Sequence, residues 1–320
     1  MSNPGIAETA PVVEKKGKLR RKHRSVEDIV FRTLNTTFLI LLALVTLYPF
    51  WNTIVVSFNQ ASDTIQGGVY FWPRVWTLQN YKTIFFSGTI YSAFFVSVAR
   101  TFISVVLNLF LTSMLAYALS RRKFIFRKPF TLIIILTLYV NAGVIPIYFL
   151  IRSLGLINSF LVYIVPGLIS AWNFLIIRTY IGAVPESLFE SARLDGAGEF
   201  RIFMKIVFPL LKPVLAAVGL FVAVGNWNSW FDTLLYASSR QDLSTLSYEL
   251  MKYLSASMTQ SRSAADIGAL GIAKDVANSM VTPMAIRAAI TVVAAAPILV
   301  VYPFLQRHFV KGIALGSVKE

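Results

Sequence analysis

The chain has 320 residues, of which 56% are hydrophobic and only 14% are charged, and its mean hydropathy is +0.65. A soluble domain does not combine so much apolar surface with so little charge, so the composition predicts an integral membrane protein. The absence of cysteine excludes disulfides, thiol catalysis and cysteine metal sites, and the net charge of +15 is better explained by basic residues that flank membrane spans than by nucleic-acid binding.

Long runs without charge predict six transmembrane helices, because a helix needs about 20 apolar residues to cross a bilayer. The predicted spans are residues 33–57, 92–119, 129–150, 160–181, 213–236 and 286–307. A tight turn at 153–155 separates the third span from the fourth. The expected fold class is therefore an all-α membrane protein.

The basic residues set the orientation of these spans. An even number of spans places both termini on one side, and with that side inside, 20 of the 30 lysines and arginines fall in inner segments and 7 in outer ones. Both termini are therefore expected in the cytoplasm. Residues 1–24 are expected to form a disordered basic tail and 25–320 the six-helix domain. A capping-box pattern at 25–28 predicts a short amphipathic helix on the inner leaflet before the first span.

A polar cytoplasmic loop, residues 182–212, predicts two short helices joined by a glycine corner. Pro185 favours the start of the first helix, and Gly196 and Gly198 break it. The second helix carries an apolar stripe of Ile202, Phe203, Ile206 and Val207. The stripe is expected to pack under the bundle while the first helix projects towards a partner. An ordinary amphipathic interfacial helix is the alternative.

This loop also carries a motif with fixed spacing, formed by Glu190, Ala192, Gly196, Ile206 and Pro209. It resembles the loop of the binding-protein-dependent ABC importer permeases, E-A-A, three residues, G, nine residues, I-x-L-P, with departures at Ser191 and Phe208. The resemblance implies the type I ABC importer permease fold, in which this loop couples the permease to a separate ATPase. The coupling residues would then be Glu190, Ser191, Ala192, Arg193, Asp195 and Gly196.

Four further stretches extend the resemblance over nearly the whole chain beyond residue 25: 47–49, 143–148, 224–230 and 309–319. They are similar to the carbohydrate-uptake permeases of the maltose permease G-like family, in particular its LplC-like oligosaccharide subgroup. The resemblance implies a multi-pass protein of the bacterial cell membrane that imports an oligosaccharide. It also implies no catalytic residue, no metal and no cofactor in this chain, since ATP and Mg are bound by the partner.

The resemblance implies three protein partners besides membrane lipid, and no nucleic acid. They are a cytoplasmic ABC ATPase dimer, a second homologous permease subunit, and an extracytoplasmic sugar-binding protein or lipoprotein. The long outer loop 237–285, which includes an apolar segment at 243–258 that is expected to be helical, would meet the binding protein.

The fifth span carries a cluster suited to sugars, because amides satisfy hydroxyl groups and flat rings cover the apolar faces of pyranoses. The cluster consists of Asn226, Trp227, Asn228, Trp230 and Asp232. In a continuous helix Asn228 and Asp232 would share one face. The cluster either lines the substrate path or forms an aromatic belt at the outer interface, where Trp is common in any case.

Three further polar residues in the spans allow two interpretations each. Asn141 and Tyr148 either line the path or bond neighbouring helices. Arg100 is expected to extend its side chain outward to the membrane surface, and the alternative is an ion pair with Asp232 or Asp63. For Asn108, helix packing is favoured.

Other functions remain as alternatives. An importer of another small polar solute would need only a different path. An ion-coupled secondary transporter would need paired acids or broken helices at mid-membrane, and the spans are nearly devoid of acids. An intramembrane enzyme would need a nucleophile with a base, or a metal pair, and the spans offer neither cysteine nor histidine.

Overall fold

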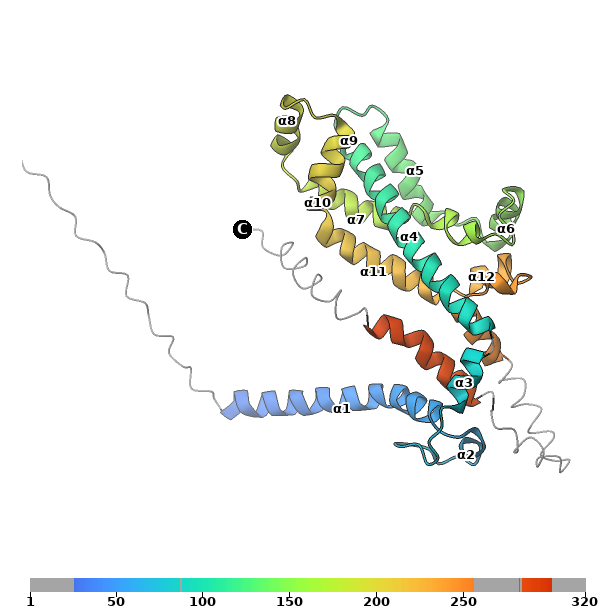
Figure 1. Ribbon diagram of the computed structural model, residues 1–320. Helices are drawn as coiled ribbons and strands as arrows, with labels where there is room; N and C mark the ends of the chain where they lie inside the picture. Colours follow the sequence, from blue (N-terminus) through green and yellow to red (C-terminus); the bar gives the residue numbers. More distant parts are fainter. Residues whose placement is uncertain (1–25, 87, 256–281, 283, 301–320) are drawn as a thin grey trace, which may run out of the picture. The chain divides into compact units, whose positions relative to one another are not determined.

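The computed structural model describes residues 26–86, 88–255, 282 and 284–300, and the regular secondary structure of this part of the chain is helical apart from one isolated bridge between Asn59 and Trp76 (Figure 1). The chain divides into two units, residues 1–50 and 51–320, and all packing described below lies within the second. The expected tail 1–24, residues 256–281 of the outer loop and the end of the chain beyond 300 lie outside the described residues.

Two helices are long and apolar enough to cross a membrane by themselves: α1 (Val26–Ser57) and α4 (Thr89–Ser120). They contain the first two predicted spans and extend beyond them. The prediction of a separate amphipathic helix before the first span is wrong, because α1 runs without a break from Val26 through Pro49. No glycine separates the amphipathic stretch from the apolar run, so one helix continues through both.

The next three predicted spans are each broken, so their prediction as continuous helices is wrong. Span three consists of α5 (Arg127–Tyr139) and α6 (Val144–Ser153). Span four consists of two 3-10 turns, η1 (Phe160–Tyr163) and η2 (Val165–Gly167), followed at 45° by α7 (Ala171–Gly182). Span five consists of α11 (Lys212–Asn228) and α12 (Phe231–Tyr236). A further apolar helix, Met284–Val300, covers most of the sixth.

The breaks have local causes. Gly143 lies before α6 at φ +81, a left-handed conformation that L side chains disfavour. Pro166 lies within η2 and cannot donate a backbone hydrogen bond. The turn predicted at 153–155 is confirmed, since α6 ends at Ser153 and Gly155 has φ +68.

The segment between α1 and α4 is held by two buried asparagines, Asn59 and Asn80, and Asn80 Nδ2 donates to Ser57 O and Asn59 O, both at 2.9 Å. Asn59 is fully buried, its Oδ1 accepts from Val75 N at 3.0 Å, and its Nδ2 donates to Asp63 at 2.9 Å in α2 (Ala61–Ile65). The hydrogen bond from Asn59, together with the hydrogen bond and ion pair from Arg74, lowers the pKa of Asp63 against the opposing effect of desolvation. The short helix α3 (Gln79–Phe86) follows and leads to α4.

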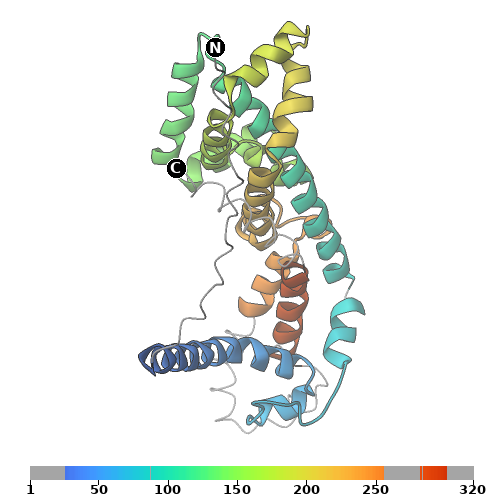
Figure 2. The same ribbon diagram turned by 90° about the vertical axis from the view of Figure 1, so that its left-hand side faces the viewer.

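Helix α4 packs against both α7 and α11, and Figures 1 and 2 show it running past both. The shared core consists of large side chains that are almost completely buried, among them Tyr117, Phe174, Ile177, Phe203 and Val218. Membrane helices associate by close van der Waals packing rather than by removal from water, and this cluster provides such packing between the three helices.

A buried polar stripe runs along α4 at helical spacing: Ser97, Arg100, Ser104, Asn108 and Thr112. Three of its members, Ser104, Asn108 and Thr112, bond backbone carbonyls of the broken fourth span. Asn108 Nδ2 donates to Gly167 O at 2.7 Å, and Ser104 Oγ donates to Tyr163 O at 3.4 Å. Non-helical backbone at membrane depth requires such partners. Asn108 also accepts from Asn173 at 3.1 Å, which confirms its predicted packing role.

The described part of the outer loop begins with the turn η4 (Gln241–Leu243) and a helix at 246–255. The prediction of a helical segment there is confirmed for these residues. The helix is attached to α4 at its first turn, where Leu246 N donates to Ser97 Oγ at 2.8 Å.

Candidate functional site

The polar loop forms a helical hairpin, here defined as residues 186–210. Its first helix is α8 (Glu186–Leu194), and its second arm combines α9 (Glu199–Ile202), a π-helical turn (Phe203–Val207, η3) and α10 (Phe208–Leu210). Gly196 lies at the corner with φ +76 and nothing within 4 Å of a Cβ, so backbone conformation rather than space requires glycine there. The predicted pair of helices with a glycine corner is confirmed.

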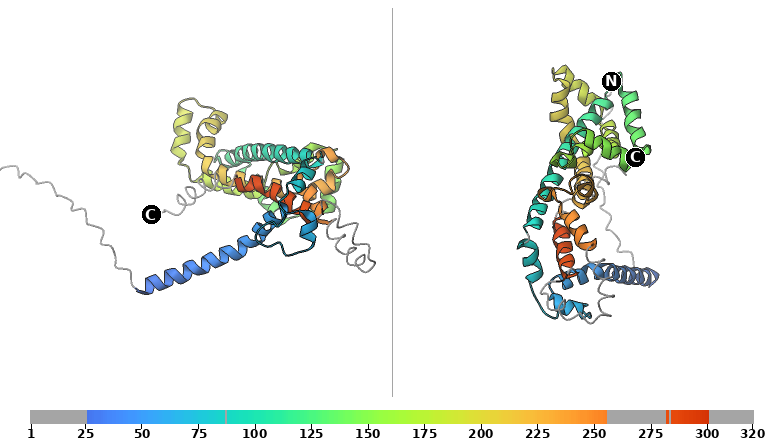
Figure 3. Two further views of the ribbon diagram at one scale, coloured as in Figure 1. Left: turned by 60° about the horizontal axis from the view of Figure 1, so that its bottom comes forward. Right: turned by 90° about the vertical axis from the view of Figure 1, so that its right-hand side faces the viewer.

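The apolar side of the hairpin is packed as the sequence predicts. Ile202, Phe203 and Val207 are buried, and Ile206 lies partly buried against the same cluster. From α8, Phe189 is fully buried and adds to this core. The second arm then meets α11 at a bend of 78°. Figure 3 shows the hairpin projecting beyond the helices to which it is attached.

The predicted coupling residues separate into two groups. Glu190, Ser191, Asp195 and Gly196 are exposed, and the structure gives no ion pair for Glu190 among the described residues. Ala192 and Arg193 are turned inward: Ala192 is buried beside Phe189, and the Arg193 side chain is only 26% exposed. The exposed group therefore forms the outer face of α8 and of its corner.

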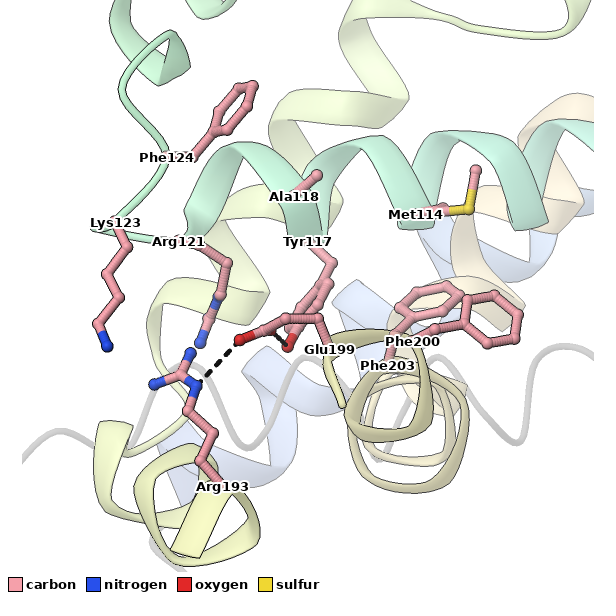
Figure 4. A pocket seen from close by; sticks show the side chains of 10 residues that line it. All are labelled: Met114, Tyr117, Ala118, Arg121, Lys123, Phe124, Arg193, Glu199, Phe200 and Phe203. Atoms are coloured by element: carbon pink, nitrogen blue, oxygen red, sulfur yellow. Dashed lines mark hydrogen bonds and ion pairs between the residues drawn. The ribbon is translucent and has the colours of Figure 1, made fainter. Parts of the chain in front are cut away.

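A charge cluster fastens the hairpin to the end of α4 (Figure 4). Glu199 accepts hydrogen bonds from Tyr117 Oη at 2.5 Å and from Arg193 Nε at 2.9 Å, so one carboxylate joins α4, α8 and α9. Glu186 lies 3.6 Å from Arg121 and 3.9 Å from Arg193. The cluster ties the start and the end of α8 to the same point on α4.

Arg121 completes this attachment from the last residues of α4. Its guanidinium carbon lies 4.0 Å from the Phe189 ring centroid and 4.7 Å from that of Tyr117. Desolvation acts to raise the pKa of Glu199, but the hydrogen bonds from Tyr117 and Arg193 outweigh it and the pKa is lowered. The carboxylate is therefore ionised at neutral pH, as the cluster requires.

Sequence reasoning missed Tyr117, Arg121 and Glu199. Tyr117 and Glu199 are 82 residues apart, so no local spacing connects them. The only signal was the presence of polar and charged side chains at the end of a span next to a charged loop.

A second site is a cavity of about 400 Å³ with a mixed polar and apolar lining, here called the Arg100 cavity, between α4, α6, η1, η2, α7, α11 and α12. Its polar lining consists of Arg100, Asn108, Tyr163, Ser170, Asn173, Asn226, Ser229, Asp232 and Tyr236. Amide, hydroxyl and phenol groups make up most of this polar part, and the rest of the lining is apolar. The arrangement can therefore exchange hydrogen bonds with a hydroxyl-rich molecule.

An ion pair between Arg100 and Asp232 lies at one edge of the cavity. The Arg100 side chain is 2% exposed, lies 4.6 Å above the Tyr163 ring and also donates to Ser229 O at 3.3 Å. Asp232 in turn accepts from Ser229 Oγ and from Thr233 N, both at 2.9 Å. The expectation that Arg100 extends to the membrane surface is therefore wrong, and its alternative, a pair with Asp232, is what the structure contains.

Of the predicted path residues, the cavity brings together Asn226 and Asp232. Asn228 and Asp232 do not share a helix face, because α11 ends at Asn228. Trp227 is 7% exposed and donates to Ala294 O at 2.8 Å, away from the cavity. Trp230 packs edge-on against its neighbour Phe231.

The two residues from the third span lie apart from the cavity lining. Asn141 Oδ1 accepts from Gly143 N at 2.9 Å and so stabilises the break before α6. Tyr148 stacks on Tyr236 with ring centroids 6.0 Å apart, and Tyr236 itself lines the cavity. Sequence reasoning missed Asn173, Ser229 and Tyr236 as lining residues.

Comparison with known proteins relates the whole chain to transport permeases. Two relatives from Bacillus subtilis (strain 168) are the polygalacturonan/rhamnogalacturonan transport system permease protein YtcP and protein LplC. YtcP is 35% identical over 92% of this chain and 100% of its own length, and LplC is 34% identical over 94% and 99%. A crystal structure of a bacterial ABC transporter involved in the import of the acidic polysaccharide alginate has 27% identity and a TM-score of 0.77, covering 90% of this chain and 99% of that one.

The family described as binding-protein-dependent transport system inner membrane component matches residues 108–315, a range that includes both the hairpin and most of the lining of the Arg100 cavity. The chain therefore belongs to this family of ABC importer permeases, and within it to the LplC-like group.

Proposed function

We propose that this chain is the permease subunit of an ATP-driven importer that moves an oligosaccharide across the bacterial cell membrane. The observation that carries the proposal is the hairpin, whose outer face is exposed while its inner face is fastened to α4. The relatives support the substrate class: YtcP is named for polygalacturonan, AraQ proteins at 28–29% identity for arabinooligosaccharides, and the matched structure for alginate.

The proposed topology has six crossings with both termini in the cytoplasm. The crossings are α1, α4, α5 with α6, η1 to α7, α11 with α12, and the helix that contains Met284–Val300. The preference of basic residues for one set of loops supports this orientation. Residues 1–24 would form the basic tail and 25–320 the permease domain, with 182–212 as its coupling loop.

The proposed ATPase contact is the exposed face of α8 and its corner, with Glu190, Ser191, Asp195 and Gly196 at the surface and Ala192 and Arg193 supporting it from behind. A separate cytoplasmic ATPase dimer would bind there and would hold the ATP and Mg. Closure of that dimer would move α8, and the cluster around Glu199 would pass the movement to α4.

The proposed substrate path runs through the Arg100 cavity, with Asn226 and Asp232 in its lining. The other predicted path residues would join this path after movement of the helices or beside the partner subunit: Asn141, Tyr148, Trp227, Asn228 and Trp230. A second, homologous permease subunit would complete the path. The loop 237–285 would meet the extracytoplasmic sugar-binding protein.

The corner of the hairpin provides a test with a matched control in the chain. Gly196→Ser places a side chain at φ +76, where L residues lose about 1–2 kcal/mol, whereas Gly198→Ser places the same side chain at φ −69, at the N-cap of α9. In the reconstituted importer, Gly196→Ser should lower sugar uptake per ATP hydrolysed by a factor of about 5–30. Gly198→Ser should leave it unchanged.

Uptake and ATP hydrolysis are measured together in proteoliposomes that contain the ATPase, the second permease and the binding protein. Equal coupling in the two serine variants would refute the role of the corner. Recovery of the permease without any ATPase would refute the function itself.

A further inference from the structure

A pocket of about 430 Å³ lies between the end of α4, the following turn and the second arm of the hairpin. Figure 4 shows its two ends: Arg121, Lys123 and Arg193 gather at one, and Met114, Phe200 and Phe203 lie at the other. A pocket with cations at one end and apolar side chains at the other matches a molecule with an anionic head and an apolar tail.

The cationic end has capacity for one more acceptor. Arg121 is 8% exposed, and its Nη1 forms an ion pair with Glu186 at 3.6 Å but no hydrogen bond to any described residue. Lys123 forms no ion pair within the described part of the chain. Of the residues that line the pocket, Glu199 alone is acidic, and it is engaged by Arg193 and Tyr117. An incoming phosphate would satisfy Arg121 and pair with Lys123.

The surroundings indicate lipid rather than water. In the turn after α4, Ile125 is 86% exposed and Phe126 is 58% exposed, and Phe200 on the hairpin is 64% exposed. Arg121, Lys123 and other basic residues interleave with these apolar side chains in residues 121–128. Exposed aromatic and aliphatic groups among cations are typical of the level of the lipid headgroups, and basic pockets between helices at the cytoplasmic side hold anionic lipid heads.

We propose that this pocket binds one anionic phospholipid of the inner leaflet, with its phosphate at Arg121 and Lys123 and an acyl chain along Met114 and Phe203. The proposal rests on the orientation given under the proposed function, which puts this end of α4 at the cytoplasmic leaflet. The lipid would occupy the base of the hairpin, next to the cluster around Glu199, where it would affect how firmly the hairpin is held.

Two variants test the site from its two ends. Lys123→Gln removes a cation from the head end, and Ala118→Phe fills the wall of the pocket from an exposed position on α4 without a change of charge. The matched control is Arg122→Gln, which removes a charge from the same turn outside the pocket. Melting temperatures of the purified complexes check that each variant is folded.

The complete importer is reconstituted in nanodiscs of phosphatidylcholine and phosphatidylglycerol in equal amounts, and the lipid retained after mild delipidation is measured by native mass spectrometry. Phosphatidylglycerol retained by the permease should fall about fivefold in Lys123→Gln, the factor for about 1 kcal/mol per cation, and should be lost in Ala118→Phe. Arg122→Gln should retain the wild-type amount.

Wild-type retention in both pocket variants would overturn the proposal. So would loss of the ATPase from the Lys123→Gln complex with phosphatidylglycerol still bound, because the pocket would then hold a protein segment. Failure of the proposed function gives a different result, namely no ATPase in the wild-type complex in any lipid.

Discussion

Replacement of Asp232 by alanine should destabilise the permease by about 3–5 kcal/mol, because it leaves a buried guanidinium without its counter-charge. Arg100 is 2% exposed and has no other carboxylate partner among the described residues. Its Nε already lacks a hydrogen-bond partner there, so the side chain cannot reorganise cheaply. Asp232 also accepts from Ser229 and Thr233, and its loss frees the start of α12.

A matched control separates burial from ion pairing as such. Asp242 forms an ion pair with Arg240, but their side chains are 60% and 51% exposed. Exposed pairs contribute little, so Asp242→Ala should leave stability nearly unchanged. The measurement is thermal unfolding of the purified permease in detergent, followed by loss of the monodisperse peak. Equal losses in the two variants would contradict the assigned role of burial.

The double variant Arg100→Met with Asp232→Ala distinguishes a charge effect from a packing effect. Removal of both charges avoids an unpaired buried cation, so most of the stability lost in Asp232→Ala should return. A double variant no more stable than the single one would show that Asp232 acts through its hydrogen bonds with the Ser229 hydroxyl and with Thr233 N instead.

Replacement of Glu199 by alanine should lower sugar uptake per ATP hydrolysed by roughly tenfold while the ATPase stays bound. Glu199 receives hydrogen bonds from Tyr117 on α4 and Arg193 on α8. Without it Arg193 keeps only the longer ion pair to Glu186 at 3.9 Å, and the link from Tyr117 to the hairpin is lost. Hydrogen bonds to a charged group contribute about 1.5–3 kcal/mol, and the 55% exposure of this side chain reduces that value. The hairpin would still offer its outer face but would transmit less movement.

Two further variants sharpen this test. Glu190→Ala removes a carboxylate from the exposed face of the same hairpin and should weaken recovery of the ATPase, which Glu199→Ala should not. Tyr117→Phe keeps the ring that packs against Arg121 and Phe203 and loses one of the two bonds to Glu199, so its effect should be intermediate. Identical behaviour of the two glutamate variants would refute the division between contact and attachment.

The hairpin was predictable because its signals are local. Each signal acts over a few residues: Pro185, Gly196 and the apolar stripe. The loop that contains them is charge-rich and lies between apolar runs, so its boundaries are clear in the sequence. The long helices were predictable for the same reason. A charge-free run needs no distant partner to be helical in a membrane.

The breaks in spans three to five could not be derived in the same way. A count of charged residues does not distinguish one continuous apolar helix from two shorter apolar helices. The shorter helices of these three spans are themselves mostly apolar. What stabilises the fourth span in its broken form is distant: Ser104 and Asn108 on α4 bond its free carbonyls. The sequence predicted that Asn108 packs against another helix, but not which segment it bonds.

The ion pair of the Arg100 cavity could not be predicted from local sequence either. Arg100 and Asp232 are 132 residues apart, and sequence alone allowed either a pair or an arginine that reaches the surface. Burial of Arg100 against Tyr163 decides between them, and that contact depends on the break in span four.

The backbone bends by 78° at Leu211, so a force applied to the second arm of the hairpin reaches α11 from a different direction. The second arm of the hairpin continues directly into α11. A sideways force on this arm therefore acts at a distance from the α11 axis and rotates α11 about that axis. α11 has 17 residues, a length of about 25 Å, and ends at Asn228. A modest rotation at one membrane surface would thus present different side chains of α11 to the Arg100 cavity, with every hydrogen bond along the helix kept.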